Sequence, residues 1–318
     1  MQTRPLGRTG ISIAPLVFGG NVFGWTADEA TSFALLDRFV ERGFNAIDTA
    51  DVYSAWAPGN RGGESETIIG NWLARRGRRD DVVLMSKVGM WEPRKGLRAA
   101  NIEAAAAESL RRLRTDYLDV YFAHLDDANT PLEETLEAFA RLIAAGKVRA
   151  IGASNYGTQR LEAALAISAD KGLPRYEVLQ PRYNLYDRAE FEHSLAQAAS
   201  KHELGVVCYF GLASGFLTGK YRGPEDLAGK DRGGFVKAYL DPRGQRILGA
   251  LDQAAAELSA TPAQIALAWL IARPAITAPI ASARTLEQLD QILGAARLSL
   301  PAQTMAMLDA ASAPEGES

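Results

Sequence analysis

Four polar side chains in the first half of the chain have the types needed to protonate an oxygen atom: Asp48, Tyr53, Lys87 and His124. A tyrosine hydroxyl, with an ordinary pKa of about 10, is a poor acid at neutral pH. A nearby ammonium group stabilises the phenolate and lowers that pKa, and a carboxylate can hold the ammonium in place. Histidine could orient a carbonyl oxygen beside them. The four residues therefore predict proton transfer to a carbonyl oxygen.

This chemistry needs a second reactant at the carbonyl carbon. No serine or cysteine stands beside a candidate base in the sequence, so the chain itself offers no nucleophile. A hydride donor would complete the reaction, and a nicotinamide cofactor is an ordinary source of hydride. Each residue alone also has a purely structural interpretation, such as a loop cap for Asp48 or a solvated strand end for Lys87. Their arrival together after three successive predicted strands favours the chemical interpretation.

The segment FNAIDTADVYS, residues 44–54, carries two of the four residues and one further acid. It begins as a short apolar run that Asp48 closes, and Tyr53 follows after a loop that must turn back over the strand end. Asp51 lies between the two and is expected to cap this loop without a part in the chemistry. His193 and His202, on a predicted helix, are interpreted as surface residues.

Short apolar runs alternate with longer segments of helical periodicity along the whole chain. The predicted strands are 15–20, 44–48, 81–87, 117–125, 148–154, 176–180, 205–210 and 275–282. The predicted helices are 28–42, 64–76, 101–114, 132–145, 158–170, 190–203, 244–258, 261–271 and 286–297. Eight strand–helix units without a break in composition predict an α/β fold, a (β/α)8 TIM barrel that forms one domain over residues 1–318. A doubly wound sheet also alternates strands and helices, but the strand count favours the barrel.

Three segments fall outside this repeat. Residues 3–16 are predicted to form a hairpin that plugs the lower end of the barrel. Residues 221–243 form a long loop after the seventh strand, and loops of this length are usually lids, binding loops or disordered segments. The tail from about residue 313 is expected to be disordered. In such barrels the carboxyl ends of the strands carry the chemistry, which is where the four polar residues fall.

The composition excludes several classes of protein. A net charge of −3 over 318 residues gives no basic patch for nucleic acid. A single cysteine, Cys208, rules out an internal disulfide and fits a reducing compartment. The sequence shows no signal peptide and no apolar run long enough for a membrane span. We therefore expect a cytoplasmic protein without a metal site, either a monomer or a homo-oligomer, that acts on a small molecule.

Seven segments, in order along the chain, resemble those of the aldo-keto reductases. They are DTADVYS, SKVG, AHLDD, IGASNY, LQPRYNLYDR, YFGLASGFLTGKYR and PIASARTLEQL, and the resemblance runs from about residue 4 to residue 300. It implies an NADPH-dependent reductase of aldehydes or ketones that can also oxidise alcohols, with NADH as the less favoured cofactor. Tyr53 would be the general acid, Lys87 and Asp48 would tune it, and His124 would position the substrate carbonyl.

The resemblance also implies how the cofactor is held. Residues after the fifth and sixth strands would bind the carboxamide, Tyr209 would stack on the nicotinamide, and Arg284 would meet a 2′-phosphate. That last position favours NADPH over NADH. The implied cofactor-binding residues are Gly20, Asn21, Ser154, Asn155, Gln180, Tyr209, Phe210, Gly211, Leu212, Ser214, Gly215, Lys220, Ser282, Arg284 and Gln288.

The chain departs from the family pattern at two places. Phe210-Gly211 stands where relatives often have Ser-Pro, which removes a hydroxyl and a rigid turn, and Ile292 stands where many have an adenine-binding asparagine. Two other nucleotide sites are disfavoured. The Walker pattern would need Gly and Ser or Thr where the chain has Ser214 and Tyr221, and no G-x-G-x-x-G follows the first strand.

Four aromatic residues would line an apolar substrate pocket, although packing between helices and barrel is an alternative for each: Trp25, Trp56, Trp91 and Tyr183. Two other functions stay open. The first is a cofactor-binding regulatory subunit of slow turnover, against which the intact set of four polar residues weighs. The second is a Schiff-base aldolase in which Lys87 would be the reacting amine.

Overall fold

We describe the protein from a computed structural model of its 318 residues. The structure describes residues 2–229 and 233–314. The disorder predicted for the tail therefore falls mostly on residues outside the described ranges.

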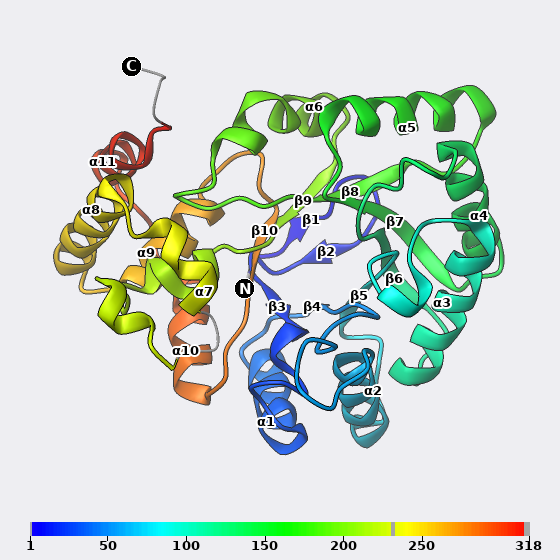
Figure 1. Cartoon of the computed structure of the whole chain (residues 1–318), viewed down its shortest axis with the longest axis horizontal. Helices are drawn as coiled ribbons and strands as arrows, with labels where there is room; N and C mark the ends of the chain where they lie inside the picture. Colours follow the sequence, from blue (N-terminus) through cyan, green and yellow to red (C-terminus); the bar gives the residue numbers. More distant parts are fainter. Residues whose placement is uncertain (1, 230–232, 315–318) are drawn as a thin grey trace.

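Eight parallel strands close into a barrel, because the last strand pairs with the first (Figure 1). The strands are β3 (Val17–Gly19), β4 (Ala46–Asp48), β5 (Val83–Val88), β6 (Leu118–Ala123), β7 (Val148–Ser154), β8 (Tyr176–Gln180), β9 (Gly205–Cys208) and β10 (Ala278–Ala281). Almost all their residues are buried, since helices cover the outer face and side chains fill the interior. The predicted (β/α)8 barrel is confirmed.

Helices surround this barrel on its outside (Figure 1). They are α1 (Glu29–Glu41), α2 (Glu64–Arg76), α3 (Ala99–Leu113), α4 (Leu132–Ala144), α5 (Thr158–Lys171), α6 (Ala196–Lys201), α7 (Gly233–Val236), α8 (Pro242–Leu258), α9 (Pro262–Ile271), α10 (Leu286–Gly294) and α11 (Ala302–Ser312). Helix α1 begins where Asp28 Oδ1 accepts a hydrogen bond of 2.8 Å from the Thr31 amide. Helix α9 begins with a capping box between Thr261 and Gln264. These starts agree with the sequence signals.

Two segments differ from the predicted pattern. Helix α11 was not expected, because its buried residues do not form an apolar stripe that periodicity would reveal. The predicted helix 190–203 begins as a π-helix at Phe191–Leu195 before it continues as α6. His202, at the end of this segment, is half-buried and its Nε2 lies 2.8 Å from Glu162 Oε2, so it is not a simple surface residue.

The N-terminal hairpin closes one end of the barrel, as predicted. Its strands are β1 (Arg4–Pro5) and β2 (Ser12–Ile13), and Leu6, Ile11 and Ile13 join the apolar cluster that fills the barrel interior. Gly7 has a φ of +56°, and a Cβ added there would lie 2.5 Å from the backbone nitrogen of Gly205. Only glycine permits the turn to approach β9 this closely.

The long loop after β9 has short helices of its own in its described parts, at Pro224–Leu227, α7 and Lys237–Tyr239. Residues 230–232 lie outside the described ranges. Side-chain hydrogen bonds attach the loop to the segment after β8. Tyr239 Oη donates to Asp187 Oδ2 at 2.9 Å, and Tyr186 Oη donates to Asp241 Oδ2 at 2.7 Å. This loop was predicted to be a lid, a binding loop or a disordered segment, and its described parts are ordered.

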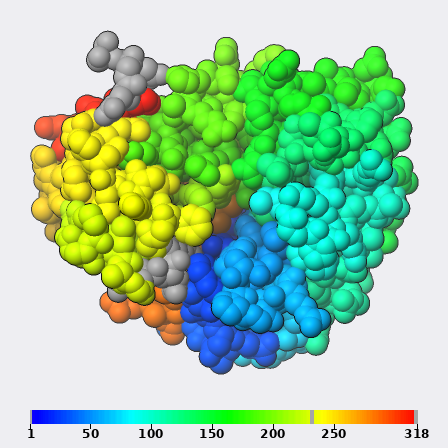
Figure 2. Space-filling model, viewed as in Figure 1, coloured from blue at the N-terminus to red at the C-terminus, as the bar shows by residue number. Residues whose placement is uncertain are grey.

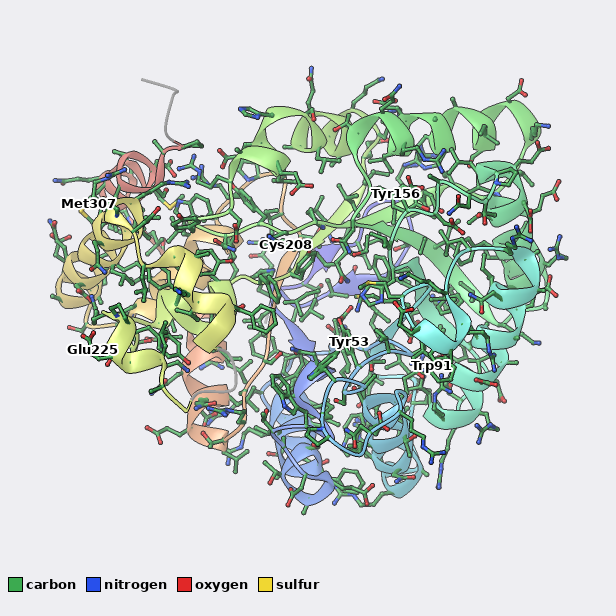
Figure 3. The ribbon with its side chains drawn as sticks, viewed as in Figure 1. Tyr53, Trp91, Tyr156, Cys208, Glu225 and Met307 are labelled. Carbon is green, nitrogen blue, oxygen red and sulfur yellow. The ribbon has the colours of Figure 1, made fainter. Side chains whose placement is uncertain are left out.

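The space-filling view shows a hollow near the middle of one face, between the blue N-terminal segments and the yellow-green segment after β9 (Figure 2). Tyr53 lies near the middle of the same view (Figure 3). In the part of the chain that the structure describes, no single helix is long and apolar enough to cross a bilayer. The bent pair α8 and α9 meets this criterion only when both helices are counted together, with 94° between them.

Candidate active site

Lys87 lies at the centre of a buried polar group at the carboxyl ends of β4 and β5. Its Nζ is 2.7 Å from Asp48 Oδ2, 2.8 Å from the carbonyl oxygen of Thr49 and 2.7 Å from Tyr53 Oη. The side chain of Lys87 is 0% exposed. An ammonium group has three N–H donors, so these three contacts occupy all of them.

Asp48 connects this group to the opposite side of the barrel. Its Oδ2 accepts hydrogen bonds from Lys87 and from Tyr53 Oη, the latter at 3.1 Å. Its Oδ1 accepts a hydrogen bond of 2.9 Å from Gln180 Nε2 at the end of β8. The carboxylate is almost fully buried, and its three hydrogen-bond donors hold it in one position.

Tyr53 keeps its proton in this environment. Burial, followed by the Asp48 carboxylate, raises the pKa of Tyr53 well above its ordinary value. The expected net lowering of this pKa is therefore wrong for the resting site, because burial and the Asp48 anion oppose the phenolate. Burial also lowers the pKa of Lys87, while Asp48 acts in the opposite direction. At neutral pH Tyr53 is therefore a protonated phenol, and Lys87 and Asp48 hold its hydroxyl in place.

His124 lies beside Tyr53 at the end of β6. The two ring centroids are 6.0 Å apart, and the His124 amide donates to the carbonyl oxygen of Val88 at 2.9 Å. Burial, followed by the Lys87 ammonium, lowers the pKa of His124 well below 6.5. The imidazole is therefore neutral at neutral pH, with one N–H donor and one acceptor. Such a ring can donate a hydrogen bond to a carbonyl oxygen without adding charge.

Amide and hydroxyl groups gather next to this set at the ends of β7, β8 and β9. Ser154 Oγ donates to the carbonyl oxygen of Gln180 at 3.0 Å, and Asn155 Nδ2 donates to that of His124 at 2.8 Å. Tyr209 Oη donates to Asn155 Oδ1 at 2.6 Å. The sequence-predicted carboxamide-binding residues and the predicted stacking tyrosine thus form one connected group.

The segment after β9 turns sharply through residues with left-handed backbone. Phe210, Ala213, Ser214 and Gly215 have φ values of 56°, 47°, 58° and 96°. Turns of backbone amides form anion-binding concavities in other proteins. A Cβ added to Gly215 would lie 3.4 Å from Lys220 Nζ, so the ammonium lies over this turn.

The predicted adenine end of the site lies where β10 meets β3. Ser282 Oγ donates to Asn21 Oδ1 at 2.6 Å, and a Cβ on Gly19 would lie 2.6 Å from Ser282 Oγ. Helix α10 begins just beyond, where the Arg284 amide donates to Gln288 Oε1 at 3.0 Å. The remaining predicted residues lie along the same path: Gly20 is buried at the end of β3, Gly211 is buried and Leu212 is half-buried.

The sequence matches the family model described as the Aldo/keto reductase family over residues 15–313. The chain belongs to this family. It is 35% identical to the uncharacterized oxidoreductase YrpG of Bacillus subtilis, over 100% of this chain and 98% of that protein. It is 32% identical to the aldo-keto reductase YhdN of the same organism, over 89% of this chain and 85% of that protein. It is 31% identical to a probable voltage-gated potassium channel subunit beta of Arabidopsis thaliana, over 97% and 95%.

Membership of the aldo/keto reductase family makes the protein an oxidoreductase for carbonyl compounds, in a family that generally uses nicotinamide cofactors. The residues present fit such a cofactor. Amides and a tyrosine ring lie beside Tyr53, and the cations Lys220 and Arg284 lie farther along the rim. Among the described residues, no group of three or more His, Cys, Asp or Glu side chains is arranged to hold a metal ion.

Three of the four predicted pocket residues of this aldo/keto reductase lie near the rim. The Trp56 ring packs edge-on against Tyr53, with centroids 6.0 Å apart, and against Trp25 at 5.7 Å. Trp91 Nε1 donates to the carbonyl oxygen of Arg61 at 2.7 Å and so holds a neighbouring loop. Tyr183 is different: it is 2% exposed and packs on other aromatic side chains in the core. Its position corresponds to the packing alternative and not to a pocket wall.

Sequence reasoning missed two apolar rim residues and one supporting amide. Met90 and Leu125 are exposed, and they follow the ends of the neighbouring strands β5 and β6. Buried Asn184 donates through Nδ2 to the carbonyl oxygen of Phe210 at 3.0 Å and supports its left-handed turn. All three residues follow the ends of barrel strands, and this position is the sequence signal that could have identified them.

The environment of Asp51 was not foreseen in the sequence analysis. Asp51 was expected to cap its loop without a part in the chemistry, and the structure shows its side chain buried, with 2% exposed. The reason is that the loop folds inward, where its carboxyl group faces Glu66 and Arg112. These two form a buried ion pair with 2.7 Å between Arg112 Nε and Glu66 Oε2. No local pattern in the sequence indicates that a loop acid will be enclosed by two later helices.

Proposed function

We propose that this aldo/keto reductase is an NADPH-dependent enzyme that reduces aldehydes or ketones to alcohols, with Tyr53 as the proton donor. The observation that carries this proposal is the contact set of Lys87. Its buried Nζ lies within hydrogen-bonding distance of both Asp48 and Tyr53. A buried ammonium beside a protonated phenol is arranged to stabilise the phenolate that proton transfer creates.

A bound nicotinamide would supply hydride to the carbonyl carbon. The residues of the chain do the rest: neutral His124 orients the carbonyl oxygen, and Tyr53 Oη gives its proton to that oxygen as negative charge develops. Lys87 then stabilises the Tyr53 phenolate, and Asp48 keeps Lys87 charged and in place. The same positions allow an alcohol to be oxidised, with Tyr53 as the base.

Ser154, Asn155 and Gln180 would hold the carboxamide of the cofactor, and Tyr209 would cover its ring. Support for NADPH over NADH comes from positive charge at Arg284, beside the start of α10, because cations and helix N-termini both favour a phosphate. The departure at Ile292, which is buried in the core, leaves adenine recognition to other residues such as Gln288.

The exposed rim near Tyr53 supports an apolar substrate. Trp56, Met90 and Leu125 are all exposed, and they come from the loops after β4, β5 and β6. These are the same loops that follow or carry Tyr53, Lys87 and His124. An aromatic or aliphatic carbonyl compound would bury this surface, whereas a sugar would leave it facing hydroxyl groups.

The test is a screen of NADPH oxidation with aromatic aldehydes, ketones and sugars. Tyr53→Phe should lower kcat by about 100-fold or more, because it removes the proton donor, while NADPH still binds. Tyr117→Phe is the matched control, since Tyr117 lies before β6 at the opposite end of that strand. Full activity in Tyr53→Phe would refute the mechanism, and failure of the wild type to bind NADPH would refute the assignment.

A regulatory subunit is the second candidate, because one relative is named as a probable potassium channel subunit beta. The hypothesis of a regulatory subunit predicts that the protein binds NADPH but turns over carbonyl compounds only slowly. The Schiff-base alternative is disfavoured by geometry. All three donors of Lys87 Nζ are occupied and the side chain is fully buried, so no lone pair is available to attack a substrate.

A further inference from the structure

Asp51 is a buried carboxyl group that the proposed reaction does not use. Its side chain is 2% exposed, and among the described residues no side chain donates a hydrogen bond to either carboxyl oxygen. It lies on the loop between Asp48 and Tyr53, and its amide approaches the carbonyl oxygen of Lys87 at 3.4 Å. An unpaired carboxylate in such a place is costly, so the group is more stable when it keeps its proton.

Charged or titratable groups from four elements face Asp51. They are Glu66 on α2, Arg112 on α3, Lys87 on β5 and Tyr121 on β6. Two ion pairs are already complete around it, Asp48 with Lys87 at 2.7 Å and Glu66 with Arg112 at 2.7 Å. Ionisation of Asp51 would therefore add a third negative charge that has no cation of its own.

The direction of the proton equilibrium follows from this arrangement. Burial, followed by the Glu66 carboxylate, raises the pKa of Asp51 from 3.8 to about 8. Arg112, the backbone amide of Val52 and Lys87 oppose this rise, in that order, without cancelling it. Asp51 is therefore neutral at pH 7 and becomes an anion in mildly alkaline solution.

We propose that Asp51 is a positioning residue for carbonyl reduction, neutral while the reaction runs and inhibitory when it loses its proton. This inference rests on the proposed function. Reduction leaves Tyr53 as a phenolate after its proton has moved to the product oxygen. A neutral Asp51 leaves Lys87 to stabilise that phenolate, whereas an ionised Asp51 attracts the Lys87 ammonium and competes with the phenolate for it. Asp51 acts through Lys87 and touches neither reactant.

The first test is the pH profile of kcat for NADPH-driven reduction in the wild type and in Asp51→Asn. Wild-type kcat should fall about tenfold as pH rises through the ionisation of Asp51, equivalent to about 1.4 kcal/mol. The asparagine variant, with the shape of the neutral acid, should show no such fall. Asp170→Asn, an exposed acid on α5, is the matched control and should keep the wild-type profile. A fall of equal size in Asp51→Asn would overturn the proposal.

The second test needs no activity. Folded Asp51 keeps its proton up to about pH 8, whereas the unfolded chain loses it near pH 4, so wild-type stability decreases as pH rises across this window. The Tm of Asp51→Asn minus that of the wild type should therefore grow from pH 5 to pH 8 and then level off. A constant difference would overturn the neutral state of Asp51. Asp51→Ser, smaller and also uncharged, replaces the asparagine variant in both tests if that variant does not fold.

The outcomes separate this inference from the function on which it rests. A wild-type protein that reduces no carbonyl would refute the proposed function, and the role of Asp51 with it. A wild-type enzyme that is active, with the same pH profile in Asp51→Asn, would refute only the role of Asp51.

Discussion

One buried nitrogen atom, Nζ of Lys87, joins Tyr53, the proposed proton donor, to the rest of the barrel. It contacts Asp48, Tyr53 and the backbone of Thr49, and it has no exposed surface. At the scale of single residues, this contact is what allows the proposed mechanism to use a tyrosine with a raised pKa as the acid. In that mechanism the phenolate left by proton transfer is stabilised by a cation that is already in contact with it.

Lys87→Met tests this role. Methionine has a similar length but cannot donate hydrogen bonds, so the phenolate loses its cation and we expect kcat for reduction to fall about 100- to 10,000-fold. The KM for NADPH should change little, because Lys87 lies under Tyr53 and away from the predicted phosphate-binding residues. Steady-state kinetics measures both quantities. Lys171→Met, on the outer surface of α5, is the control, and a Lys87→Met enzyme within tenfold of the wild type would contradict the prediction.

Each barrel strand presents its last residues at one rim, and the hairpin closes the opposite end. The register pairs Asp48 with Met85 and Lys87 with Phe122, so Lys87 lies two positions beyond the partner of Asp48, and His124 lies two positions beyond the partner of Lys87. At the scale of elements, the lower end depends on close backbone contact between the hairpin and β9. Gly7 and Gly205 meet there, where a side chain on either would collide with backbone.

Gly7→Ala and Gly10→Ala form a matched pair that tests this contact. Both glycines have positive φ, +56° and +74°, so alanine costs about 1–2 kcal/mol of backbone strain at each. Only at Gly7 would the added Cβ meet backbone, since no atom lies within 4 Å of a Cβ on Gly10. We expect Gly7→Ala to lower the free energy of unfolding by at least about 2 kcal/mol more than Gly10→Ala. Urea unfolding measures this difference, and equal losses would show that the hairpin contact is dispensable.

Closure of the barrel makes one continuous rim from residues at both ends of the chain. Ser282 and Asn21 are 261 positions apart in sequence and are hydrogen-bonded across the β10–β3 junction. At the scale of the whole molecule, a cofactor that spans Tyr209 to Arg284 would lie across the ends of β9 and β10. These strands lie next to the β10–β3 pairing that closes the barrel. Cofactor binding would therefore stabilise the entire fold, by about 2.7 kcal/mol at a concentration 100 times its Kd.

The preference for a 2′-phosphate can be measured through this stabilisation. NADP+ should raise the Tm more than NAD+ at equal concentration, because Arg284 adds a charged contact for the extra phosphate. Arg284→Gln should remove most of the difference while leaving the shift with NAD+ nearly unchanged. Arg297→Gln, an exposed arginine beyond the end of α10, is the control. Equal shifts with both cofactors in the wild type would contradict the preference for NADP+.

Local patterns were sufficient for the eight barrel strands, for most of the helices and for the identity of the main polar residues, but not for α11. Strands that are buried on both faces appear in the sequence as apolar runs. Helix caps such as Asp28 and Thr261 have recognisable sequence signals. The main polar residues follow successive strand ends, in the order Asp48, Tyr53, Lys87 and His124. Barrel topology places all strand ends on one rim, so the meeting of these four residues was predictable once the fold was.

Only the tertiary structure decided the electrostatic environment of the site. The sequence showed Asp51 as a polar loop residue, but α2 and α3 enclose it, and it faces Glu66 and Arg112. The predicted direction of the Tyr53 pKa shift was wrong for the same reason, because burial raises this pKa. Tyr183, which was predicted to line the pocket, lies in the core. Burial and charge–charge distance depend on which elements pack together, and neither is encoded in the spacing of residues along the chain.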